Sequence, residues 1–226
     1  MSPDITWWQV IATSAVASAV VNIIANVALK QWDHWREDSR EGEKRHVVYL
    51  DIALQLEEFS FRAEKILESI SEGIAKYRTE HDARSLEALE DIHFKFDESI
   101  EWDRVPAEIA VRAKTFPRTF QRSQGFIIAA WRYWADLDDA WEYDAERVAF
   151  YGLGAISFAA EIRRKIGVAD DPQVAELTKV FERHIDSRRT IFKTSRSEDC
   201  VIPELREKFI KEGLSVLPPA TDGGNP

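Results

Sequence analysis

Apolar residues follow two different patterns along this chain of 226 residues. The first is an unbroken apolar stretch at residues 10–29 that contains no charged side chain. At a rise of about 1.5 Å per residue, a helix of this length spans roughly 30 Å, the thickness of the hydrocarbon core of a bilayer. The stretch predicts one transmembrane helix over residues 9–30, with a short external N-terminus at 1–8.

Tryptophans flank the predicted span on both sides, at Trp7, Trp8, Trp32 and Trp35. Their amphipathic rings settle at headgroup depth, so we expect all four to anchor the helix. Lys and Arg follow the span and none precedes it, which favours an N-terminus outside and a C-terminal domain in the cytoplasm. Because no basic segment precedes the apolar run, we expect a retained single-pass span, with the bilayer as a partner, and no cleaved signal peptide.

The predicted span has two unlike faces. Small and polar residues gather on one of them, at Ser14, Ser18, Asn22 and Asn26, while branched apolar residues cover the other. Small residues let helix backbones approach closely, and Asn side chains hydrogen-bond between helices. This face predicts self-association through the span. The alternatives are an oligomer that lines a polar path and a simple anchor that tolerates its two Asn residues.

The second pattern is the three-and-four spacing of amphipathic helices, which is clearest from residue 46 to residue 77. Additional apolar positions widen its stripe beyond a narrow seam, which favours a helix in a globular bundle over a two-stranded coiled coil. The fold predicted is therefore all-α, with an N-terminal transmembrane helix, a juxtamembrane stalk at 31–45, a cytoplasmic helical bundle at 46–214 and a disordered tail at 215–226.

Breakers and caps divide the bundle. A helix is expected to restart near Asp82, although the alternation at 92–97 also fits a short strand. Pro117 is expected to break or kink a helix ahead of a segment at 119–137. A further helix at 139–166 carries Gly152 and Gly154, which permit close approach of a neighbour. Its end at Gly167, the cap at Asp171-Pro172 and a short helix after Pro203 complete the pattern.

Charge and cysteine content exclude several classes of partner and site. The formal net charge of −10 repels nucleic acid, so no nucleic-acid partner is expected. Cys200 is the single cysteine, which excludes an intramolecular disulfide and a multi-cysteine metal cage.

Three polar patterns resemble metal sites, and each also has a simpler interpretation. The acidic residues from Asp136 to Glu142 resemble a magnesium-binding stretch, but Asp139 with Glu142 also forms a capping box. Glu-x-x-His pairs at 43–46 and 90–93 resemble di-iron ligands, and such pairs also arise by chance. His46 with His81-Asp82 resembles a phosphohydrolase spacing, but Asp82 also serves as an N-cap. No catalytic residue, cofactor or metal ligand is predicted.

A local excess of bases interrupts the acidic chain at Arg112, Lys114, Arg118 and Arg122. These residues form a candidate face for a partner or ligand. Alternatively, they pair with the protein's own acidic segment at 136–146 or are simply solvated.

Three segments carry a loose resemblance over most of the chain: residues 7–16, the helix at 49–59 and the aromatic, acidic region at 131–141. They resemble small bacterial single-span membrane proteins with a helical cytoplasmic domain. The resemblance implies an inner (cytoplasmic) membrane location, and no activity carries over from it. The function predicted is a non-enzymatic, membrane-tethered module that senses or scaffolds a cytoplasmic partner. Alternatives are an oligomerising effector that perturbs the bilayer and a metal-dependent hydrolase.

Overall fold

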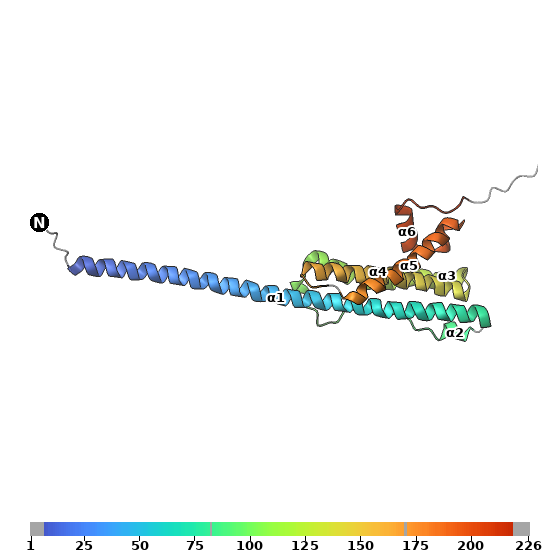
Figure 1. Cartoon of the computed structure of the whole chain (residues 1–226), viewed down its shortest axis with the longest axis horizontal. Coiled ribbons are helices and arrows are strands. Elements are labelled where there is room, and N and C mark those ends of the chain that lie inside the picture. The colour runs from blue at the N-terminus through green and yellow to red at the C-terminus, as the bar shows by residue number, and fades with distance from the viewer. Residues whose placement is uncertain (1–6, 82, 170, 219–226) are drawn as a thin grey trace, which may run out of the picture. The chain divides into compact units, whose positions relative to one another are not determined.

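The computed structural model describes residues 7–81, 83–169 and 171–218, with side chains from residue 42 onward (Figure 1). This part of the chain is helical and contains no strand, which confirms the all-α prediction. Its elements are α1 (Trp7–Glu80), α2 (Arg84–Glu87), η1 (Trp102–Arg104), α3 (Ala107–Tyr133), α4 (Leu137–Lys165), α5 (Pro172–Thr194), η2 (Glu198–Cys200) and α6 (Pro203–Lys211).

The chain divides into two compact units, Met1–Val47 and Val48–Pro226. Among the residues described with their side chains, no helix is long and apolar enough to cross a membrane. The predicted span at 9–30 lies outside those residues, together with its anchors and its polar face.

The second unit is built on the apolar stripe of α1. Ile52, Leu56, Phe59 and Ile70 are all buried, at 2% exposure or less. The positions that widen the stripe, Val48, Ala53, Leu67 and Ile74, are buried as well. This breadth of burial confirms a helix packed in a globular bundle, because a two-stranded seam would cover only a narrow line of residues.

The central helix of this unit is α4, which packs against α3 and α5. Polar contacts also tie it to α1: the Ser60 hydroxyl donates to the carbonyl of Gly152 at 3.1 Å, and Arg163 pairs with the buried carboxylate of Glu57. The end of α5 and the whole of α6 enclose a second apolar cluster, which contains Ile185, Phe192, Ile202, Leu205 and Phe209.

Several boundary predictions are confirmed. Asp171 is the N-cap of α5, and its carboxylate accepts from the backbone N–H of Gln173 at 2.8 Å. Gly167 follows the C-cap of α4 with φ +69°, a left-handed conformation that suits glycine. The short helix after Pro203 is also present.

Four local predictions are wrong or need adjustment. α3 runs unbroken through Pro117, because Ala113 and Phe120 are buried on either side of it and hold both turns on the core. Residues 92–97 form no strand, and the helix expected after Asp82 is only the single turn of α2. α4 begins at Leu137 with Asp136 as its N-cap, so Asp139 lies inside the first turn and makes no capping box.

Gly152 lies directly against the ring of Phe181. A methyl group built on Gly152 would lie 2.5 Å from Cζ of that fully buried ring. We expect Gly152→Ala to lower the free energy of unfolding by about 1–3 kcal/mol through overpacking, even though alanine favours the helix. Chemical denaturation of the full chain measures this loss.

Gly154→Ala is the matched control on the same helix. Its added methyl group would approach nothing closer than Cε2 of Phe116 at 3.9 Å, an ordinary contact. Its stability should stay level or rise slightly. Equal losses in the two variants would show that the Gly152–Phe181 approach carries no special constraint.

Candidate functional site

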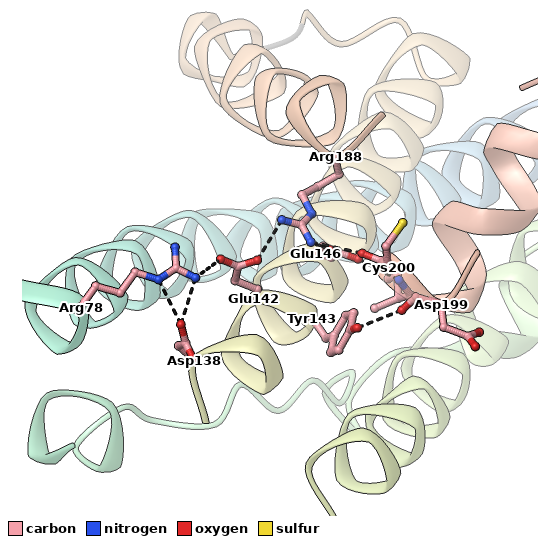
Figure 2. Close-up of polar contacts among 9 residues, drawn as sticks. Arg78, Asp138, Glu142, Tyr143, Glu146, Arg188, Asp199 and Cys200 are labelled. Carbon is pink, nitrogen blue, oxygen red and sulfur yellow. Dashed lines mark hydrogen bonds and ion pairs between the residues drawn. The ribbon is translucent and has the colours of Figure 1, made fainter. Parts of the chain in front are cut away.

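A chain of ion pairs joins α1, α4 and α5 (Figure 2). On α4, Glu142 and Glu146 lie one turn apart and face Arg188 of α5, whose Nη atoms lie 3.0 Å and 2.5 Å from their respective carboxylate oxygens. The other oxygen of Glu142 lies 2.7 Å from Nη2 of Arg78 on α1, and Arg78 also pairs with Asp138 at 3.0 Å. Glu142 therefore bridges two arginines that come from different helices.

Residues of this ion-pair network also bind the C-terminal segment. The second carboxylate oxygen of Glu146 accepts the backbone N–H of Ile202 at 2.8 Å, and Arg188 donates to the carbonyl of Cys200 at 3.3 Å. The hydroxyl of Tyr143 donates to the carbonyl of Asp199 at 2.9 Å. The bonds from Glu146 and Tyr143 hold the loop between α5 and α6 against α4, and the bond from Arg188 holds it against α5.

Burial sets the protonation behaviour of this cluster. The side chain of Glu146 is 0% exposed, and its burial raises the pKa to about 7, although Arg188 and the Ile202 N–H favour its charged form. His184 lies one turn before Arg188 on α5. Burial, together with the nearby charge of Arg188, lowers the pKa of His184 to about 4.

The arrangement supplies no nucleophile and no metal cage. Burial raises the pKa of the Cys200 thiol, so the thiolate is scarce at neutral pH. Among the described residues, no three His, Cys, Asp or Glu side chains lie together as metal ligands do. Asp138 and Glu142 of the acidic stretch are held by Arg78. His46, His81 and His93 are exposed, and Asp82 lies outside the described residues.

The four predicted basic residues do not form one face. The guanidinium of Arg112 pairs with Glu161 at 2.5 Å and lies 4.0 Å from the ring centroid of Phe158. Lys114, about 160° away around α3, lies over the ring of Trp102 at 4.9 Å. Arg118 and Arg122 follow Lys114 at helical spacing and are exposed. The acidic segment at 136–146 pairs with Arg78, Arg147 and Arg188 instead.

Sequence reasoning missed the buried charges. The positions of Glu142 and Glu146 could have predicted an ion pair between helices. Two acids one turn apart beside an apolar run need a cation from another helix. Asp144 and Arg147 carried another, since their spacing of three places them together on α4, where they pair at 2.7 Å. Nothing in the local pattern identified Arg188 as the partner of Glu146.

Comparison of the chain with protein-family models, with curated proteins and with solved structures gave no match. Its function must be inferred from the side chains and contacts of the described residues.

Glu146 and His184 make opposite contributions to the pH dependence of stability. The folded-state pKa of Glu146 is raised from 4.5 to about 7, so its contribution favours folding at low pH and is lost as the pH rises through this window. The pKa of His184 is lowered from 6.5 to about 4, so its contribution grows over the range 4 to 6.5. The two partly cancel in the native chain.

We therefore expect two single variants to have opposite effects. Relative to the native chain, Glu146→Gln should make stability rise more steeply between pH 5 and 6.5, and His184→Gln should make it fall more steeply over the same range. Urea denaturation at a series of pH values measures both slopes. Slopes parallel to that of the native chain in both variants would contradict the assignment.

Proposed function

We propose that the chain is a membrane-tethered, non-enzymatic helical module whose α3 binds an acidic segment of a cytoplasmic partner protein. The observation that supports this most directly is a row of unpaired cations on a protein of net charge −10. The row, here called the outer basic strip, consists of Lys114, Arg118, Arg122 and Arg132 of α3.

The outer basic strip is a true helix face. Its four residues lie within about 80° around the axis of α3, and all are exposed. Within the described residues, Arg118, Arg122 and Arg132 have no ion-pair partner, whereas the arginines that face α4, such as Arg78 and Arg188, are engaged by acids. The only acid of α3 is Glu108, in its first turn. The field along the strip is therefore positive, and it attracts carboxylates.

The surroundings of the strip suit a protein partner. Tyr133 and Trp134 are 73% and 55% exposed at the C-terminal end of α3. Arginine beside exposed aromatic rings is the composition enriched at protein interfaces. Gly125 lies in the strip between Arg122 and Arg132, and nothing approaches within 4 Å of where its Cβ would be. A partner backbone can therefore approach the helix closely at this point.

The tether rests on the sequence of residues 9–30. An uncharged run long enough for a bilayer, with Trp on both flanks and bases after it, supports a single span with the helical unit in the cytoplasm. A module anchored in this way concentrates its partner at the membrane surface, which raises the effective concentration for a second contact there. This gives a scaffold function without catalysis.

Neutralising the strip should abolish binding of an acidic probe. The probe is a fluorescent peptide of Asp and Glu residues with one central Trp, titrated into the full chain in nanodiscs of zwitterionic phosphatidylcholine. We expect Arg118→Gln/Arg122→Gln/Arg132→Gln to weaken binding by about tenfold or more, because three charge-assisted contacts are lost. Added salt should weaken the native complex.

Arg112→Gln is the control for position, since it removes one arginine charge from the same helix on another face, and each single variant of the strip is compared with it. Its affinity for the peptide should stay within about twofold of the native value.

A photo-crosslinking residue at position 125 should capture a partner in living cells that one at Glu68 does not. Equal peptide binding by the triple variant and the control would refute the proposal. Binding of anionic phosphatidylglycerol vesicles without peptide binding would assign the strip to lipid.

A separate prediction concerns self-association through the polar face of the predicted span. We expect Asn22→Leu/Asn26→Leu to reduce self-association, because interhelical amide hydrogen bonds of about 0.6–2 kcal/mol each are removed. Energy transfer between labelled chains in liposomes measures the change, and Val16→Leu/Val20→Leu on the lipid-facing side is the control. If dye leakage accompanies self-association and disappears with it, the bilayer-perturbing alternative gains support. Unchanged energy transfer in the Asn variant would exclude this face as the contact.

A further inference from the structure

A second feature of the bundle is an apolar cleft of about 370 Å³ between α2, α3 and α4. Most of its lining is aliphatic or aromatic, and the indole rings of Trp131 and Trp141 are part of it. The charged residues that line the cleft are all acids: Glu87, Asp91 and Asp144. No Lys or Arg lines it. The cleft therefore combines mostly apolar walls with charged lining residues that are all acidic, of which Asp144 is paired with Arg147.

Asp144 is the unusual member of this lining. It is only 4% exposed, and its Oδ1 accepts from Nε of Arg147 at 2.7 Å. Its Oδ2 is also buried but has no hydrogen-bond partner among the described residues. A buried carboxylate oxygen without a donor is costly, and native structures rarely keep one without a purpose.

Arg147 makes no hydrogen bond to that oxygen, and its own Nη2 is also buried without a hydrogen-bond partner among the described residues. Its Nη1 donates to the carbonyl of Phe120 at 3.4 Å, and the guanidinium carbon lies 4.3 Å from the centroid of the Phe120 ring. Its Nε therefore binds one oxygen of Asp144, and the other oxygen has no hydrogen-bond donor among the described residues. Burial raises the pKa of Asp144, and the negative field of nearby Asp91 adds to this, although Arg147 acts in the opposite direction.

We infer that this cleft binds a small organic cation, a primary ammonium on an apolar body. Its ammonium group would donate to the free oxygen of Asp144, and Asp91 would add electrostatic attraction. The apolar body would lie against the indole rings of Trp131 and Trp141, whose faces also attract cations. The volume is within the range of small-molecule sites. This inference does not depend on the outer basic strip, which has the opposite charge.

Competing ligands fit the lining less well. A small anion would meet three carboxylates and no lining cation. A hard metal ion needs several oxygen ligands around one point, and the described residues offer no group of three. A neutral apolar ligand would pack against the apolar walls but would leave the oxygen of Asp144 without a donor.

The test compares two probes of matched shape, 2-phenylethylammonium and 3-phenylpropionate. Each is titrated calorimetrically into the full chain in nanodiscs of zwitterionic phosphatidylcholine, with empty nanodiscs as the blank. We expect saturable binding of the ammonium and none of the carboxylate. Equal binding of both probes, or no saturable binding of the ammonium up to about 10 mM, would overturn the inference.

Variants at the rim locate the binding to this cleft without disturbing its core. Ile128 lines the cleft and is 48% exposed, so a charged side chain is tolerated there. Ile128→Lys should weaken ammonium binding by about tenfold or more, and Ile128→Glu should leave it equal or tighter. Equal affinities in these two variants would place the ligand elsewhere.

Asp144→Asn tests the carboxylate itself, and Glu68→Gln, an exposed acid on α1 outside the cleft, is the control. We expect a loss of about tenfold or more for Asp144→Asn and none for the control. If Asp144→Asn retains the native circular dichroism and binds as tightly as the native chain, the role of Asp144 is refuted. If that variant unfolds, the comparison of the two Ile128 variants decides the question.

Discussion

The buried pair of Arg188 and Glu146 is the interaction on which the arrangement of the bundle depends. Taking both charges out of water is costly, and only close pairing with further hydrogen bonds repays that cost. The structure meets both conditions, because Arg188 also contacts Glu142 and the Cys200 carbonyl, and Glu146 accepts the Ile202 N–H. Loss of the cation would leave a carboxylate buried without compensation at the point where α4, α5 and the loop to α6 meet. The second apolar cluster follows directly on this junction.

Four acids of the segment at 136–146 already have cation partners that do not come from α3. Asp138, Glu142, Asp144 and Glu146 pair with Arg78, Arg147 and Arg188. Lys114 of the outer basic strip lies over the ring of Trp102, but Arg118, Arg122 and Arg132 have no ion-pair partner among the described residues. A buried ion pair is consistent with a purely structural role, whereas a row of unpaired cations at the surface has no stabilising role within the bundle.

The predictions that succeeded depended on local chemistry. The stripe on α1, the Asp171 cap and the left-handed Gly167 each follow from residues within one or two turns of each other. Two of the features that sequence analysis got wrong or missed involved contacts between distant residues. Packing on both sides of Pro117 kept α3 continuous, and the position of α5 brought Arg188 to Glu146 across more than forty residues of sequence. Helical geometry alone would have separated Arg112 from Lys114, since their spacing of two puts them on opposite sides of α3.

That same geometry explains how one helix carries two surfaces of opposite charge. Successive residues of a helix point about 100° apart, so Trp131 lines the acidic cleft while its neighbour Arg132 belongs to the outer basic strip. The cleft attracts cations with an apolar body, and the strip attracts carboxylates. A ligand suited to one surface is repelled by the other, which keeps the two binding chemistries distinct although they share the last turns of α3. Substitutions in the outer basic strip should therefore leave ligand binding in the cleft unchanged, and substitutions in the cleft should leave binding to the strip unchanged.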